Sequence, residues 1–196
     1  MFYYRVNAAI ELRLLEERHA DLLVSLIQAN QAYLKRWQPG YVDVTTVEEV
    51  TRGIKASLQR FADNNGFQAG IWVAGALVGT VTCNSIDWSN QNADIGYWLG
   101  ERFQGQGVAT QACKALIDYL IHDLKLQRIE IVTIAGNRAS RKIPERLGFH
   151  EEGIARQKYW LHDTFVDSVT YGLLAHEWPP AIASTPNGPC ASLGPV

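Results

Sequence analysis

The stretch GERFQGQGVATQAC, residues 100–113, holds residue types that can bind an anion through the backbone. Gly105 and Gly107 are separated by one residue and stand beside what reads as the start of a helix. Glycine lets a backbone approach a ligand closely, and the first N–H groups of a helix attract negative charge because they have no internal partner. The stretch predicts a nucleotide or coenzyme phosphate site, with a glycine-rich packing turn as the alternative.

Two common phosphate motifs do not fit this stretch. In a P-loop beginning at Gly100, Gln106 would stand where a lysine must reach the phosphates, and Gly107 would replace the hydroxyl that binds magnesium. In a dinucleotide fingerprint, Thr110 would occupy a position that requires Gly or Ala. The antiparallel strands expected early in the chain also disfavour the dinucleotide fold, and the P-loop is excluded.

Apolar periodicity places the glycines between a central strand and a helix. It predicts about seven strands, at 10–14, 67–74, 77–85, 92–100, 128–134, 150–156 and 167–174. About four helices are expected, at 20–34, between Thr46 and Phe61, after the glycines and within 137–149. The predicted fold is α/β, with a mixed, mostly antiparallel central sheet and one β–α–β crossover.

Local signals sharpen the ends of some elements. Thr46 and Glu49 form a capping box that begins the second helix. Gly66 is expected to be the left-handed residue that ends this helix. Gly75 predicts the tight turn of a hairpin between the second and third strands.

Composition excludes several function classes. The net charge of −2 offers no basic stripe for nucleic acid, and the three cysteines show no metal-ligand spacing, so no metal is expected. The N-terminus lacks an apolar signal region and no apolar run is long enough to span a membrane, which predicts a cytoplasmic protein. We expect one domain over 1–178 and a flexible tail rich in Pro, Gly, Ala and Ser over 179–196.

Three segments together resemble a known family. RFQGQG resembles the [QR]xxGx[GA] coenzyme A loop of the GNAT acetyltransferase superfamily. NRASRKIPERLGF resembles the second coenzyme segment of that family, and ADIGYWL resembles the strand that carries its acidic base. The segment NRASRKIPERLGF and the closing segment DSVTYGLLAHEW are also similar to the ribosomal-protein N-acetyltransferases of the Rim type. The resemblance covers residues 10–178 and implies the GNAT fold.

The resemblance implies acetyl-CoA as the cosubstrate. The loop and the helix that follows it would hold the pyrophosphate, Asn137 would bond the pantetheine arm, and the backbone N–H of Trp98 or Leu99 would bond the thioester carbonyl. Arg141 belongs to a basic cluster, with Arg138, Lys142 and Arg146, that could meet coenzyme phosphates. For Arg146 a solvated helix face is the alternative. The loop and helix residues are Gln104, Gly105, Gln106, Gly107, Val108, Ala109 and Thr110.

Direct attack of an amine needs a base and an acid rather than a covalent nucleophile. Asp94 would be the base, acting through a water, although a solvated aspartate at the start of a strand is the alternative. Pro144 occupies the position of the tyrosine that serves as the acid in many family members. Ser140 matches the serine of the Rim-type subgroup and is the expected acid, with a helix-capping serine as the alternative. Pro144 would place Ser140 at a helix edge, since either the helix begins near Ser140 or Arg141 or it is bent there. Cys83 and Cys113 read as core thiols.

The acceptor side is predicted from aromatic residues. Tyr33, Trp37 and Trp88 are expected in loops near the acceptor cleft, and Tyr159 in a late turn. The resemblance favours a protein N-terminal α-amino group, of the ribosomal-protein type, as the acceptor. A polyamine or aminoglycoside amine and a non-catalytic CoA-binding module are the alternatives. A homodimer is implied by the resemblance alone.

Overall fold

The computed structural model describes residues 3–37 and 46–180. Its strands form one sheet in the order β1-β2-β3-β4-β5-β6-β8-β7. They are β1 (Tyr3–Arg5), β2 (Ile10–Leu14), β3 (Phe67–Val73), β4 (Ala76–Asp87), β5 (Asn92–Leu99), β6 (Arg128–Ile134), β7 (His150–Leu161) and β8 (Thr164–Leu174). The α-helices are α1 (Ala20–Ala29), α2 (Gln31–Lys35), α3 (Val47–Ala62), α4 (Val108–Asp118) and α5 (Arg138–Arg146). The short edge strand β1 is additional to the expected strands.

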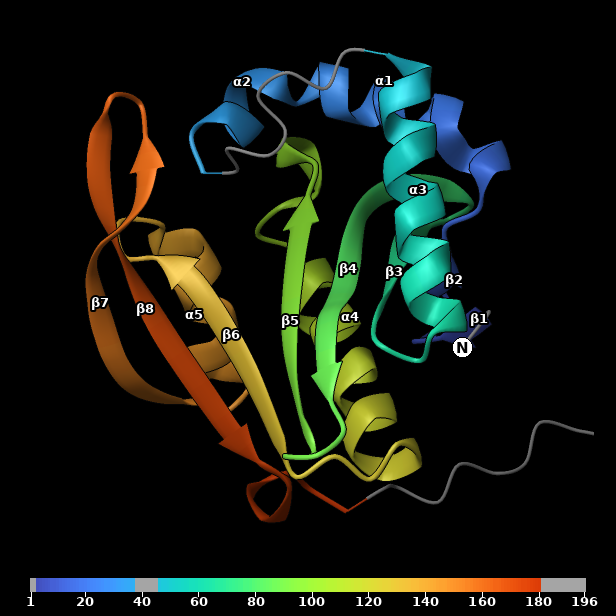
Figure 1. Ribbon diagram of the computed structural model, residues 1–196. Helices are drawn as coiled ribbons and strands as arrows, with labels where there is room; N and C mark the ends of the chain where they lie inside the picture. The colour runs from blue at the N-terminus through green and yellow to red at the C-terminus, as the bar shows by residue number, and fades with distance from the viewer. Residues whose placement is uncertain (1–2, 38–45, 181–196) are drawn as a thin grey trace, which may run out of the picture.

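The sheet has the predicted mixed topology. All neighbouring strands are antiparallel except β5 and β6, which are parallel and connected through α4. The described register pairs Asn92–Asp94 of β5 with Arg128–Glu130 of β6. Beyond this short pairing the two strands diverge toward the carboxyl end of β5 (Figure 1). The described β5–β6 pairing therefore covers only the first part of β5.

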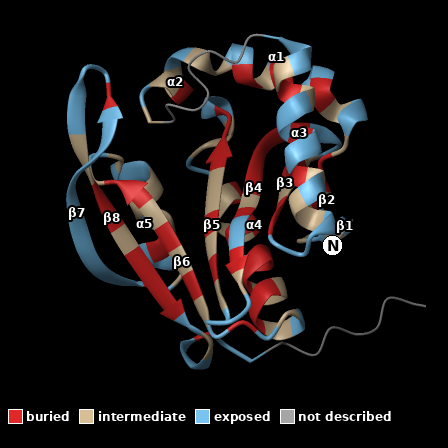
Figure 2. Cartoon of the chain, in the orientation of Figure 1, coloured by how far each residue is buried: buried red, intermediate tan, exposed pale blue. Residues whose placement is uncertain are grey.

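Helices cover both faces of the sheet. α1 and α3 pack on one face, where Trp72 and Trp98 join a buried cluster with Ile27 and Ile54. α4 packs on the other face against the larger core cluster, and α5 lies behind β6 (Figure 1). Buried residues concentrate in the central strands, whereas β7 is exposed along most of its length (Figure 2). The central strands are therefore held from both sides.

The first predicted helix is divided at Asn30. α1 ends at Ala29, and α2 begins at Gln31, which places Tyr33 on a short helix rather than in a loop. The Asn30 side chain donates to Leu26 O at 2.8 Å and accepts from the backbone N–H of Glu101 at 2.8 Å. The break thus ties the helical layer to the loop that follows β5.

The signals around α3 and the hairpin are confirmed in part. The capping box between Thr46 and Glu49 is present. The left-handed residue after α3 is Asn64, with φ 56°, so the expectation for Gly66 was wrong. Gly66 has φ 139°, and a Cβ there would lie 2.6 Å from the carbonyl oxygen of Cys83. The turn between β3 and β4 uses Gly75, at φ 83°, as predicted.

The C-terminal hairpin is longer than its sequence pattern indicated. β7 runs to Leu161, so Tyr159 lies within a strand and the turn falls at His162 and Asp163. The predicted flexible tail lies outside the described residues except for Pro179 and Pro180. Within the described part of the chain, no helix is long and apolar enough to cross a membrane.

Candidate active site

The glycine loop leads directly into α4. Gly105 and Gly107 have φ values of 72° and 76°, in the left-handed region that favours glycine, and Gly107 is the N-cap of α4. A Cβ at Gly105 would meet nothing within 4 Å. The loop therefore needs glycine at 105 for its backbone conformation, and the space beside this residue stays open to a ligand.

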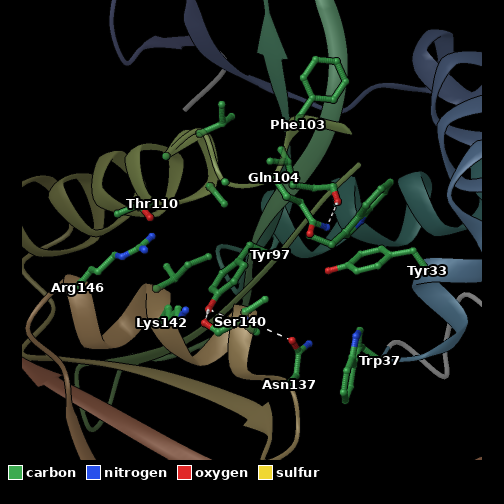
Figure 3. A pocket seen from close by; sticks show the side chains of 18 of the residues that line it. Tyr33, Trp37, Tyr97, Phe103, Gln104, Thr110, Asn137, Ser140, Lys142 and Arg146 are labelled. Atoms are coloured by element: carbon green, nitrogen blue, oxygen red, sulfur yellow. Dashed lines mark hydrogen bonds between the residues drawn. The ribbon is translucent and has the colours of Figure 1, made fainter. Parts of the chain in front are cut away.

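A cavity of about 290 Å³ lies at the N-terminus of α4. Val108, Ala109 and Thr110 line it, and because they begin the helix their N–H groups have no partner within it. Lys142 and Arg146 of α5 line the same cavity, four residues apart on one helix face (Figure 3). Helix amides and two cations together make this cavity suited to a phosphate-bearing ligand.

Gln104 and Gln106 have different places in the loop. Gln104 lines the cavity, and its side-chain amide donates to Leu99 O at 3.3 Å. Gln106 does not line it, and its side chain donates to Arg102 O at 3.0 Å. Trp98 and Leu99 both line the cavity from the end of β5. Most of the residues expected in the loop therefore surround one space.

Arg141 points away from this cavity. Its guanidinium donates to the hydroxyl of Tyr171 at 2.8 Å and to Glu151 at 2.9 Å, and it lines neither cavity. Helical geometry explains the difference, because residues 142 and 146 share a face that residue 141 does not. The cationic part of the site is thus made by Lys142 and Arg146.

A second cavity, of about 250 Å³, lies between the diverging strands β5 and β6. It is lined by Trp37, Ile95, Gly96, Tyr97, Ile131, Val132, Thr133, Ile134, Asn137, Ser140 and Tyr159. Four of these residues, Trp37, Tyr97, Asn137 and Ser140, also line the first cavity. The two cavities therefore meet at these four side chains, and none of the described lining residues of either cavity carries a carboxylate.

Ser140 is held at the junction. α5 begins at Arg138 with Asn137 as N-cap and contains Pro144, so the alternative of a start near Ser140 or Arg141 was wrong. Asn137 Oδ1 accepts from the Ser140 backbone N–H at 3.2 Å. The Ser140 hydroxyl donates to Tyr97 Oη at 3.3 Å, and the Tyr97 hydroxyl donates to the carbonyl oxygen of Ser140 at 2.9 Å (Figure 3). Ser140 lies in the first turn of the helix and lines both cavities.

Asp94 lies next to the opening in the sheet but lines neither cavity. Its side chain accepts from Asn84 Nδ2 at 2.9 Å, at a bulge in β4, and its register partner in β6 is Glu130. Burial raises the pKa of Asp94, the bond from Asn84 lowers it, and the charge of Glu130 raises it further. Strand alternation places Asp94 on the face opposite Tyr97, and Gly96, which lines the second cavity, is two residues away.

The expected aromatic residues separate into two groups. Tyr33, Trp37 and Tyr159 line the cavities. Trp88 lines neither one, because it follows β4 at the end of the sheet where β5 begins. Its indole N–H donates to the carbonyl oxygen of Asn64 at 2.6 Å. The structure therefore gives Trp88 a bond to the turn after α3 and no place in the cavities.

Two cysteine thiols of the core are chemically quiet. Cys83 and Cys113 are buried. Burial raises the pKa of Cys83 to about 12 and also raises that of Cys113, so both stay protonated near neutral pH. Among the described residues, no group of three or more His, Cys, Asp or Glu side chains could hold a metal ion.

Sequence reasoning missed Tyr97, which bonds Ser140, as well as several apolar residues that line the cavities, such as Phe103 and Ile131. Tyr97 stands in ADIGYWL, which was considered only for its aspartate and backbone amides. Pro144 was a signal for such a residue, because a proline has no N–H to donate to the Ser140 carbonyl. That carbonyl therefore requires a hydrogen-bond donor from another element. The identity of that partner depends on how β5 faces α5, which is a tertiary property.

The chain is similar to acetyltransferases in sequence. A family model described as "Acetyltransferase (GNAT) domain" matches residues 9–150. A Bacillus subtilis protein provisionally named as the ribosomal N-acetyltransferase YdaF is 38% identical over 179 residues, covering 91% of this chain and 98% of that protein. The ribosomal-protein-serine acetyltransferase of Escherichia coli is 29% identical, covering 85% of this chain and 93% of that protein.

Solved structures agree with the sequence comparison. RimL, a ribosomal L7/L12 α-N-protein acetyltransferase in complex with coenzyme A, has a TM-score of 0.86 and 27% identity, covering 89% of this chain and 99% of RimL. The microcin C7 self-immunity acetyltransferase MccE, in complex with acetyl-CoA and AMP, has a TM-score of 0.82 and 28% identity, covering 86% of this chain and 94% of MccE. These similarities extend over nearly all of the described fold.

Proposed function

Because the chain belongs to the GNAT acetyltransferase family, we propose that it transfers the acetyl group of acetyl-CoA to the N-terminal α-amino group of a protein. One observation carries this proposal. A cavity lined by helix amides and cations joins a second cavity that is lined by aromatic and apolar side chains. The first suits a phosphorylated coenzyme and the second suits an uncharged amine on an extended chain.

The residues of the first cavity fit acetyl-CoA. The amides at the start of α4 and the left-handed glycines would receive the pyrophosphate, and Lys142 and Arg146 would add charge. Asn137 Nδ2 would face the pantetheine arm, because Asn137 Oδ1 is engaged by the Ser140 N–H. When bound, acetyl-CoA supplies the acetyl group as a reactive thioester.

The acceptor amine must be neutral in order to attack. An α-amino group has a pKa of roughly 7.7–8.0, against about 10.4 for lysine, so it loses its proton far more readily near neutral pH. Asp94, with a pKa raised by burial, is a stronger base than an ordinary aspartate and would take this proton through a water. A modest base therefore suffices for an α-amine.

Ser140 and the end of β5 complete the proposed chemistry. The Ser140 hydroxyl lies where the cavities meet, and its one proton, which is directed at Tyr97 Oη in this structure, would turn to the leaving sulfur when the coenzyme is bound. The backbone N–H of Trp98 or Leu99 would donate to the carbonyl oxygen on which negative charge develops. The β6 register partners end at Glu130, so the backbone edge of β5 beyond Asp94 faces the opening.

The protein acceptor is supported by similarity and by charge. RimL and the serine acetyltransferase of E. coli are named for ribosomal proteins, and both cover most of this chain. A polyamine or aminoglycoside carries several positive charges and would be expected to face carboxylates. The described lining residues of both cavities supply none.

A panel of amines tests the proposal. Release of free CoA thiol would be followed with peptides that begin with serine or alanine, the same peptides with blocked N-termini, spermidine and an aminoglycoside. We expect turnover with the free peptides and none with the blocked ones. Faster turnover with spermidine or the aminoglycoside would show that a small amine, and not a protein, is the acceptor. Thermal protection by acetyl-CoA without turnover of any amine would indicate a binding module.

A further inference from the structure

Pro144 leaves one backbone acceptor of α5 without its helix donor. In an α-helix the N–H of each residue donates to the carbonyl four residues earlier, and proline has no N–H. The carbonyl deprived by Pro144 belongs to Ser140, which is also the proposed acid. Tyr97 of β5 donates its hydroxyl to this carbonyl at 2.9 Å. A side chain from another element thus provides the bond that the helix lacks.

The same hydroxyl also meets the Ser140 side chain. Ser140 Oγ donates to Tyr97 Oη at 3.3 Å, so one phenol contacts both oxygen atoms of Ser140. The Ser140 N–H is bonded to Asn137 at the helix cap. Both Tyr97 and Ser140 line both cavities, so the contact lies at the junction itself.

We propose that Tyr97 is a positioning residue, which holds the Ser140 hydroxyl at the junction of the two cavities in place of the helix bond that Pro144 removes. The effect of Tyr97 on turnover rests on the proposed function. Its effect on α5 does not, because the bond to the Ser140 carbonyl exists in the protein without any ligand.

Tyr97 remains a donor at every working pH. Burial raises the pKa of its hydroxyl, and the nearby Cys113 of α4 and Tyr171 of β8, whose own pKa values are raised by burial, raise it further. The contact with Ser140 therefore adds no titration of its own near neutral pH. Any rise or fall of activity with pH therefore arises from the ionisation of other groups.

Thermal unfolding tests the structural part with a double-mutant cycle. Tyr97→Phe leaves the Ser140 carbonyl without its donor, and we expect a melting temperature about 3 °C lower or more. In Pro144→Ala the alanine N–H can donate to this carbonyl, so Tyr97→Phe costs less than half as much there. An equal loss in both backgrounds would overturn the proposal. Tyr119→Phe, which removes a phenol hydroxyl outside both cavities, is the matched control and its effect is independent of residue 144.

Kinetics test the catalytic part with a second cycle. We expect Tyr97→Phe to lower kcat about tenfold with the KM for acetyl-CoA within about twofold of the parent protein, because the acid is misplaced rather than the coenzyme. In a Ser140→Ala background Tyr97→Phe causes no further loss. A further tenfold loss there, or a change confined to KM, would contradict the positioning role. If the parent protein acetylates no amine, the proposed function fails and the thermal cycle still decides the role of Tyr97.

Discussion

The coenzyme side and the acceptor side of the site are built in different ways. The proposed phosphate-binding part of the coenzyme side is a continuous stretch, residues 104–110, that acts mainly through its backbone, with two cations one helical turn apart on α5. The acceptor side gathers Trp37 from the turn after α2, Tyr97 from β5 and Tyr159 from β7, which are far apart in sequence. A binding function made from backbone geometry is local, and one made from side chains depends on the whole fold.

The strongest effect is expected where the two sides meet. Ser140→Ala removes the hydroxyl at the junction, and we expect kcat to fall about 10²-fold, within the usual range for a group that transfers a proton. The KM values for acetyl-CoA and for peptide change little, because the serine contributes little to either binding surface. An unchanged kcat would remove Ser140 from the mechanism and leave the two sides without a shared acid.

The next effect belongs to the coenzyme side alone. Gly107→Val forces a β-branched residue into φ 76°, which costs about 1–3 kcal/mol, and we expect acetyl-CoA to bind roughly 30-fold more weakly by calorimetry. Gly53→Ala is the matched control, since it lies in α3 with nothing within 4 Å of its Cβ. Equal affinity in the valine variant would mean that the loop does not hold the coenzyme.

Asp94→Asn tests the proposed base, which acts on the acceptor amine. At pH 7 roughly a tenth of α-amines are already neutral, so we expect a loss of about tenfold in kcat. In the parent protein activity falls as the pH drops through the raised pKa of Asp94, and in the variant this limb disappears. A pH profile shared by both proteins would show that Asp94 is not the base.

The same substitution has the opposite effect on stability. A carboxyl group whose pKa is raised by folding binds its proton more tightly in the native state, so its ionised form destabilises the protein once the pH exceeds that raised pKa. We expect Asp94→Asn to melt about 2 °C higher at pH 7. The gain disappears below the ordinary aspartate pKa of about 3.9, where both proteins carry a neutral group.

The smallest effects come from the acceptor walls. We expect Trp37→Ala or Tyr159→Ala to raise the KM for a peptide about fivefold, a loss near 1 kcal/mol. The KM for acetyl-CoA stays the same in Tyr159→Ala, because Tyr159 lines only the second cavity, and rises in Trp37→Ala, because Trp37 lines both cavities. Trp88→Phe is the contrasting variant, because Trp88 lines neither cavity, and its KM values are expected to match the parent protein. A larger rise of the peptide KM in the Trp88 variant than in the Trp37 variant would show that the acceptor does not bind beside Trp37.

The comparison also explains what the sequence could predict. The glycine loop before a helix and the capping box at Thr46 depend on a few adjacent residues, so the motif and its spacing were sufficient to predict them. The left-handed φ values of Gly105 and Gly107 came from the structure. The break at Asn30 depends on its bond to Glu101, which is far away in the chain. Helical spacing could not detect this contact.

The direction of side chains was the second property that the sequence could not predict. Arg141 and Lys142 are adjacent in sequence, yet one bonds Tyr171 and the other lines the coenzyme cavity. Trp88 and Trp37 were both expected in loops near the acceptor, but β4 carries Trp88 to the opposite end of the sheet from the glycine loop. The packing of the strands and helices decides which aromatic or basic residue enters a cavity. Periodicity predicts only which side chains share a face of one helix or strand.

One peptide tests the central claim most directly. It begins with serine, contains one lysine, and is incubated with acetyl-CoA and the protein, and the modified nitrogen is located by fragmentation in a mass spectrometer. The account predicts a single acetyl group on the α-amine. Acetylation of the lysine instead, or an unmodified peptide under conditions in which spermidine is acetylated, would contradict it.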